Sequence, residues 1–205
     1  MSTQQILNID SLKEQIPYYL TSEQKKGLSK ALNDFPKGTN YYLGNCSDDI
    51  KNSMLQGDIF KELTIFGERG RKEVKGIILS NSCDIDCSNQ RDFPAKALFA
   101  PLIDLARYKD ALLRSGKPQE SVDEKINSII EQRITNIVYL PAIGQMPDSI
   151  VLLDDIYQLK ATQLEELLKS DNKQFTLSQV GFYILLFKLS LHFCRFHENV
   201  ARYDS

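Results

Sequence analysis

With 205 residues, 42% of them hydrophobic and 25% charged, the chain has the size and composition of one elaborated globular domain. Its formal net charge of −2 excludes attraction of nucleic acid by the molecule as a whole, so any site for a polyanion has to be a local basic patch. Four cysteines are too few for a secreted disulfide framework, and no signal peptide or membrane-spanning apolar run is visible. We expect a cytoplasmic protein with reduced thiols and no membrane partner.

One helix and three strands are predicted in the first half of the chain. Thr21 or Ser22 can cap a helix that runs to about Phe35, before the helix-breaking residues 36–38. Between the first two strands, the polar residues 67–73 indicate a loop that reaches away from the body of the protein. The strands are predicted by period-two alternation or by short apolar runs, and they are Asp58–Phe66, Val74–Leu79 and Ala95–Leu102.

Two helices are predicted after the third strand. They are Asp104–Ser115 and Glu120–Thr135, and Gly116-Lys117-Pro118 separates them. Strand patterns lie on both sides of this pair in the sequence. Residues 104–135 therefore indicate a helical insertion between strands.

A second group of strands is predicted beyond the insertion. Asn136–Ile143 and Ser149–Ile156 form a strand pair, joined by a turn at 144–148. A short helix, Thr162–Lys169, follows this pair.

The last predicted helix covers about residues 176–200, with Thr176 or Ser178 as its cap. It is apolar nearly all round from Val180 to Leu191. A helix of this kind is either central to the core of its own chain or docked on a partner. A protein partner and a homodimer both remain open.

Four groups of residues in these strands carry a resemblance to a known family. Gly57-Asp58-Ile59 opens the first strand, Ile77–Asn81 ends the second, and Leu98–Ile103 contains an Ala-Pro pair. Asp148–Ile156 then precedes Leu159–Leu164. Together these segments resemble the plan of the MazF/PemK toxins, which are SH3-like barrels that cleave RNA. The resemblance covers residues 55–105 and 137–168, about half of the chain.

The resemblance implies an α+β fold in a single elaborated domain, residues 1–205. Its core is an SH3-like, strongly bent β-barrel formed by residues 55–105 and 137–168. The helical hairpin 104–135 and the long C-terminal helix 176–200 are additions to this barrel. The resemblance also implies a bacterial toxin or defence role, RNA as a partner, and a tendency to dimerise.

The residues that carry RNA cleavage in the family do not match. There, an arginine just before a proline of the second strand acts with a Ser or Thr that closes the third. Here the first two positions fall on Val74 and Lys75, and the last falls near Asp104. Ribonuclease activity is therefore left open.

A basic segment beside the second strand can supply a substitute for the missing arginine. Its residues, Arg69, Arg71, Lys72 and Lys75, suit contacts with an RNA backbone. The same residues also suit a solvated loop. We predict them as the nucleic-acid-binding set.

The segment Cys83-Asp84-Ile85-Asp86-Cys87 follows a buried strand and has three interpretations. The cysteines can be small edge residues without chemistry. Alternatively, Cys83 is a nucleophile, or Asp84 and Asp86 are functional carboxylates, so these three are the candidate catalytic residues.

The third interpretation is a zinc site. Its candidate ligands are Cys83, Cys87, His192, Cys194 and His197. Five residues along a helix correspond to a rotation of about 500°, so His192 and His197 splay by roughly 140° and the helix end has to unwind for both to share an ion.

Three hypotheses about function follow. The first is a nucleic-acid-associated protein of MazF/PemK type, with uncertain ribonuclease activity. The second is a protein-interaction component that docks a larger partner through its apolar C-terminal helix. The third is a metal- or thiol-dependent enzyme built on Cys83–Cys87. We expect no cofactor, and zinc enters only if the enzyme of the third hypothesis depends on metal.

Overall fold

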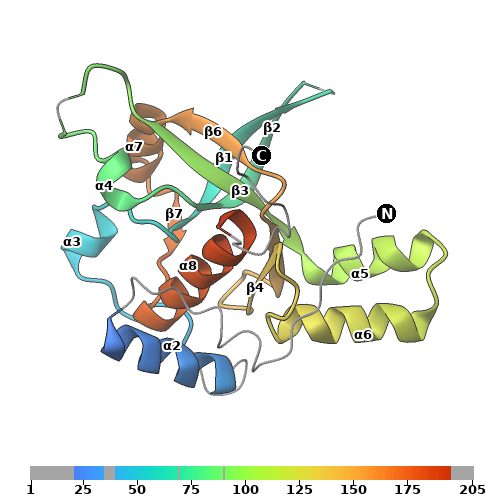
Figure 1. The fold of residues 1–205 in the computed structure, drawn as a ribbon. Coiled ribbons are helices and arrows are strands. Elements are labelled where there is room, and N and C mark those ends of the chain that lie inside the picture. Colours follow the sequence, from blue (N-terminus) through green and yellow to red (C-terminus); the bar gives the residue numbers. More distant parts are fainter. Residues whose placement is uncertain (1–20, 35–39, 69, 90, 195–205) are drawn as a thin grey trace, which may run out of the picture.

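The computed structural model describes residues 21–34, 40–68, 70–89 and 91–194, without the side chains of residues 24, 28 and 31–34. It shows an α+β protein in which helices surround a curled antiparallel β half-barrel (Figure 1). The strands are β1 (Ile59–Gly67), β2 (Gly70–Ile78), β3 (Lys96–Asp104), β4 (Ile137–Leu140), β5 (Ser149–Leu152), β6 (Tyr157–Lys160) and β7 (Lys173–Phe175). The helices are α2 (Ser22–Asp34), α3 (Asp48–Lys51), α4 (Ser82–Ile85), α5 (Leu105–Arg114), α6 (Gln119–Ile130), α7 (Ala161–Lys169) and α8 (Gln179–Phe193).

The bend of the sheet is made by β3, which changes partners along its length. The sheet order in the described residues is β4-β5-β3-β2-β1-β7, and every pairing is antiparallel. One edge of β3 pairs with β6 through residues 96–99 and with β5 through residues 102–104. Because β5 and β6 follow each other along the same edge, the sheet curls around β3.

The predicted helical insertion forms two helices, α5 and α6, which lie side by side and project from one end of the sheet (Figure 1). The carboxylate of Asp104 begins α5, since its Oδ1 accepts hydrogen bonds from the N–H groups of Ala106 at 2.8 Å and Arg107 at 3.1 Å. The hairpin has an apolar cluster of its own with β4 and β5. It therefore packs on the sheet at its base.

The last helix, α8, lies in the core of its own chain. Ile184, Leu185 and Phe187 are buried in the same cluster as residues of β1, β2 and β5, and α2 packs along α8. Gly181 allows close approach, because a Cβ there would lie 2.3 Å from the carbonyl oxygen of Tyr41. Ser178 is the cap, as predicted, and its hydroxyl accepts from the N–H of Gly181.

Several of the predicted boundaries are wrong. The strands predicted as Asn136–Ile143 and Ser149–Ile156 are shorter, since β4 ends at Leu140 and β5 ends at Leu152 before a turn. Residues 70–73 are not a loop but the start of β2, which pairs with β1 as far as Gly67 and Gly70. The sequence at the outer end of the β1–β2 hairpin resembles a loop, because this end is exposed to solvent and therefore carries polar residues. The second helix of the insertion ends at Ile130 rather than Thr135, because Gln132 adopts a φ of 59°.

The turn after α6 explains this early end. The N–H of Arg133 donates to the carbonyl of Ser128, and that of Gln132 donates to the carbonyl of Ile129, which is the Schellman pattern. Glycine is the usual residue at the left-handed position, and glutamine stands there instead.

The short strands β6 and β7 were also not predicted. The predicted part of the last helix beyond residue 194 lies outside the described residues.

Candidate functional site

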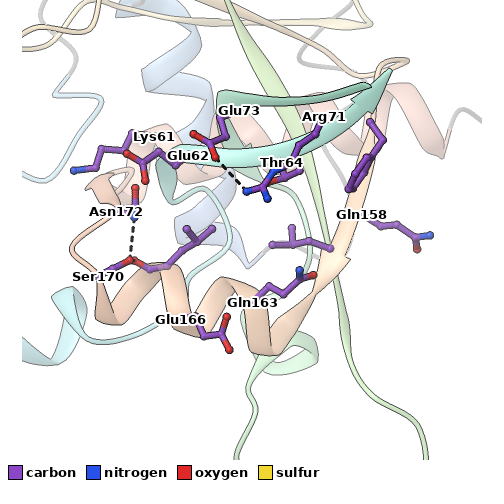
Figure 2. Close-up of a pocket in the computed structure, with 13 residues that line it drawn as sticks. Lys61, Glu62, Thr64, Arg71, Glu73, Gln158, Gln163, Glu166, Ser170 and Asn172 are labelled. Atoms are coloured by element: carbon purple, nitrogen blue, oxygen red, sulfur yellow. Dashed lines mark hydrogen bonds and ion pairs between the residues drawn. The ribbon is translucent and has the colours of Figure 1, made fainter. Parts of the chain in front are cut away.

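An open cleft of about 580 Å³ lies between the β1–β2 hairpin and the β6–α7 unit (Figure 2). Four parts of the structure supply its lining. They are a bulge in β1, the outer part of the hairpin, the β6–α7 unit and the turn that ends α7. The lining residues are Lys61, Glu62, Thr64, Phe66, Arg71, Glu73, Gln158, Leu159, Gln163, Glu166, Leu167, Ser170 and Asn172.

A β-bulge turns two consecutive charged side chains into the cleft. Phe60 pairs with Gly76 and Leu63 pairs with Val74, so three steps along β1 match two steps along β2. Phe60 and Leu63 are both buried in one core cluster. The two residues between them, Lys61 and Glu62, both line the cleft, whereas regular alternation would send one of them into the core.

The outer part of the hairpin contributes an aromatic ring beside a guanidinium. Phe66 lies directly across from Arg71 in the strand register, and 76% of its surface is exposed. Thr64 lies across from Glu73. The Nη2 of Arg71 contacts Oε1 of Glu73 at 3.2 Å, and both side chains are exposed. This ion pair positions the guanidinium but contributes little to stability in solvent.

The opposite side of the cleft offers amide groups on β6 and α7. The Oε1 of Gln163 accepts from the backbone N–H of Lys160 at 3.1 Å, which orients the amide at the start of α7. Gln158 and Glu166 are exposed beside it. Leu159 and Leu167 line the cleft between these groups and pack against the core beneath.

The turn that ends α7 places Asn172 in the cleft. Asp171 has a φ of 57°, its N–H donates to the carbonyl of Leu168, and the N–H of Asn172 donates to the carbonyl of Leu167. This is again a Schellman turn without glycine. The backbone then pairs with β1, since the N–H of Lys61 donates to the carbonyl of Asn172 at 3.1 Å.

The cleft is polar but not basic. Its cations are Lys61 and Arg71, and its carboxylates are Glu62, Glu73 and Glu166. Attraction of a polyanion at long range is therefore weak, and recognition has to come from contacts at short range.

The predicted nucleic-acid-binding residues do not form one surface patch in the cleft. Arg71 lines it, whereas Lys72 and Lys75 are exposed on β2 and do not. Arg69 lies outside the described residues. Val74, at the position of the family's arginine, packs against the core, and Asp104, near its Ser/Thr position, caps α5.

The predicted catalytic segment folds as a capped turn of helix, α4. The side chain of Asn81 accepts from the N–H of Cys83 at 2.9 Å, and Ile85 is fully buried. Cys83, Asp84 and Asp86 are exposed. The hydrogen bond from the N–H of Ser88 lowers the pKa of Asp86, so this carboxylate is ionised and holds the turn.

Cys87 lacks the surroundings of an activated thiol. Partial burial, followed by the carboxylates of Glu165 and Asp86, raises the pKa of the Cys87 thiol. The carbonyl of Cys83 accepts from the side chains of Asn89 at 2.9 Å and Arg91 at 2.7 Å. These bonds fix the loop that follows α4.

The proposed zinc ligands are not gathered in the part of the chain that the structure describes. No three His, Cys, Asp or Glu side chains of the described residues are placed to hold one metal ion. His192 lies in the last turn of α8 with its ring 4.6 Å from that of Phe193, and Cys194 follows the helix as an exposed residue. His197 lies outside the described residues.

Comparison with known proteins does not assign the chain to a family. No protein-family model matches the chain, and no curated protein matches its sequence. Among the residues that the structure describes, no helix has the length and apolarity needed to cross a membrane.

Sequence reasoning missed Lys61, Glu62, Phe66 and Asn172 as cleft residues. One signal was present, because Lys61 interrupts the apolar series Ile59, Leu63 and Ile65 at alternate positions. A charged residue at a core-facing position of a strand is the mark of a bulge. Asn172 carried no comparable signal.

Proposed function

We propose that the protein is a divergent relative of the MazF/PemK barrels that binds single-stranded RNA in the cleft between the β1–β2 hairpin and α7. The observation that carries the proposal is the exposed ring of Phe66 directly across the hairpin from Arg71, at the edge of the cleft. Bases of single-stranded RNA stack on exposed aromatic rings, and guanidinium groups bind phosphate or stack on bases. The amides of Gln158 and Gln163 can bond to base edges.

The architecture supports the SH3-like part of the proposal. The curled sheet, with β1, β2 and β3 in consecutive antiparallel order, matches the plan that the resemblance implies. The Gly57-Asp58 pair has a structural role at the start of β1. Gly57 has a φ of 90°, and a Cβ there would lie 2.8 Å from Cδ1 of Leu177.

The function that we propose is RNA binding and not RNA cleavage. The family's arginine position is a half-buried valine, and the carboxylate near its Ser/Thr position is engaged in capping α5. Arg71 and Glu73 lie in the cleft, but they form an ion pair with each other.

The two competing hypotheses have less support. Docking through α8 would need free apolar surface, and most apolar residues of α8 pack into the core cluster, whereas Phe193 at its end is exposed. A thiol or metal enzyme at Cys83–Cys87 would need a base or a ligand set, and the described surroundings of Cys87 raise the pKa of its thiol instead.

The test is fluorescence anisotropy with a short, labelled RNA of mixed sequence at low salt. We expect saturable binding, and we expect Phe66→Ala to weaken it by roughly fivefold or more, because stacking contributes about 1–3 kcal/mol per base. Arg71→Ala should weaken RNA binding more than Phe66→Ala does, and it should make the affinity less dependent on salt concentration.

Matched controls come from outside the cleft. Phe93→Ala removes an aromatic ring that is 83% exposed, and Arg107→Ala removes an exposed arginine on α5. Neither should change the affinity. The absence of saturable binding, or equal losses in Phe66→Ala and Phe93→Ala, would contradict the proposal.

A further inference from the structure

One end of the cleft holds a buried hydrogen-bond acceptor without a donor. Asn172 is 5% exposed, and its Oδ1 has no hydrogen-bond partner among the described residues. Leaving such a group unpaired is unfavourable, because it loses its hydrogen bonds to water and gains none in the protein. Because this oxygen has almost no accessible surface, a ligand in the cleft can donate to it once the side chains that cover it shift.

The hydrogen bonds around Asn172 fix which of its amide atoms is the oxygen. The hydroxyl of Ser170 has one hydrogen, which it donates to the carbonyl of Leu167 at 3.1 Å. Its oxygen can then only accept, and the Nδ2 of Asn172 donates to it at 3.0 Å. The carboxamide oxygen must face away from Ser170.

The side chains that surround this oxygen come from the bulge in β1. Figure 2 shows the amide nitrogen of Asn172 directed at Ser170 and its oxygen turned to the opposite side, toward Lys61 and Glu62. The hydrogen bond from the N–H of Lys61 to the carbonyl of Asn172 holds the two segments together. Neither Lys61 nor Glu62 has an ion-pair partner within residues 21–34, 40–68, 70–89 and 91–194. This end of the cleft thus presents two neighbouring acceptors, the carboxylate and the amide oxygen, beside one ammonium donor.

Guanine is the base whose edge complements this set. Its N1–H and N2 amino group are adjacent donors, and its O6 is an acceptor next to them. The carboxylate of Glu62 can accept from N1 and N2, Oδ1 of Asn172 can accept from the second N2 hydrogen, and Lys61 can donate to O6. Uracil and cytosine would bring carbonyl oxygens or ring nitrogens against the carboxylate, and adenine has a single amino donor.

We propose that Lys61, Glu62 and Asn172 form a pocket that selects a guanine base of the RNA bound in the cleft. The inference rests on the proposed RNA binding and adds its base preference. The bulge is what makes the pocket, since regular alternation would place only one of Lys61 and Glu62 in it.

The test compares four RNAs that are uridine tracts with guanosine, adenosine, cytidine or uridine at one central position. Wild-type protein is expected to bind the guanosine RNA at least about tenfold more tightly than the others, the scale of discrimination for a bidentate base contact. Glu62→Gln should reduce this ratio toward one, and Asn172→Ser should reduce it as well. Glu62 is exposed, so its substitution leaves the fold intact.

Glu120→Gln, an exposed glutamate at the start of α6, is the matched control and should keep the guanosine preference. Equal affinity for all four RNAs, with binding that still depends on Phe66 and Arg71, would overturn the guanine pocket and leave the proposed function standing. A guanosine preference that survives in both Glu62→Gln and Asn172→Ser would also overturn it. No binding of any of the four RNAs would remove both proposals.

Discussion

Replacing Lys173 by methionine is expected to lower the free energy of unfolding by about 3–5 kcal/mol, the cost of leaving a buried charge without its partner. The carboxylate of Asp58 is fully buried, and its Oδ2 lies 2.8 Å from Nζ of Lys173. Burial raises the pKa of Asp58, although Lys173 acts to lower it. Among the residues that the structure describes, removing the ammonium leaves this carboxyl group with two hydrogen-bond donors, the hydroxyl of Thr176 and the N–H of Leu55.

The ammonium of Lys173 also joins three parts of the chain. Besides Asp58 at the start of β1, it donates to the carbonyls of Ile50 at 2.7 Å and Ser53 at 2.9 Å, at and after α3. These three contacts use all three hydrogens of the ammonium group. Urea denaturation followed by circular dichroism gives the loss of stability in Lys173→Met.

Lys51→Met is the matched control, because the ion pair of Lys51 with Asp48 is exposed on both sides. Its effect should stay within about 0.5 kcal/mol. The double variant Asp58→Leu with Lys173→Met should recover part of the lost stability, since no charge is then buried alone. A loss below about 1 kcal/mol in Lys173→Met would show that the pair contributes no more than a surface ion pair.

The role of Asp58 shows what the resemblance to a family could and could not provide. Gly57-Asp58 was read from the sequence as the opening of a strand, and the structure places it there with Asp58 in a buried ion pair. The partner, Lys173, lies on a strand of three residues that no sequence pattern predicted. Short strands are formed by their neighbours rather than by their own periodicity, so the pattern of β7 carried no signal.

The elements that the sequence predicted well are those with long, regular patterns. The strands β1 and β3 and the helices α2, α5, α7 and α8 lie close to the predicted ranges, and β2, β4 and β5 overlap theirs with a boundary misplaced by three or four residues. The errors arose where a local exception ended or bent an element. Gln132 occupies a left-handed position that glycine usually takes, so the end of α6 was not visible in the sequence.

The candidate site depends on these same exceptions. A bulge presents Lys61 and Glu62 together, and a Schellman turn at Asp171 brings Asn172 beside them. Since Asn172 is distant in sequence from the bulge, only the pairing of β1 with the chain after α7 joins them. The chemically reactive residues that the sequence singles out are exposed and lie elsewhere, Cys83 in the short helix α4 and Cys87 in the turn after it.

A buried lysine in α8 gives the second large prediction. Lys188 is fully buried and donates hydrogen bonds to the carbonyls of Gln132, at 2.9 Å, and Ile134. These carbonyls follow the C-terminus of α6, where a donor is favourable. The amine therefore fastens the base of the helical hairpin to the central helix. Burial lowers its pKa to about 7.

Stability is expected to rise as the pH increases from about 7 to about 10, by up to roughly 4 kcal/mol. In this window the unfolded chain still binds a proton at Lys188, because an exposed lysine titrates near pH 10.5, while the folded chain has released it. The unfolded state thus binds more protons, and each step up in pH favours the folded state. Above about pH 10 the trend should reverse, because burial raises the pKa of Tyr41, Tyr42 and Tyr139 and the folded state then holds the extra protons.

Urea denaturation at a series of pH values measures this slope directly. Lys188→Met should remove most of the rise between about pH 7 and about pH 10, whereas Lys72→Met, at an exposed lysine of β2, should leave the slope unchanged. The methionine also leaves the carbonyls of Gln132 and Ile134 without their donor, so the stability of this variant at one pH does not isolate the charge. The difference between the pH slopes of the wild type and Lys188→Met does isolate the contribution of the charge. Equal slopes in the wild type and Lys188→Met would mean that the two carbonyls keep the amine protonated in the folded state, and that burial does not decide its charge.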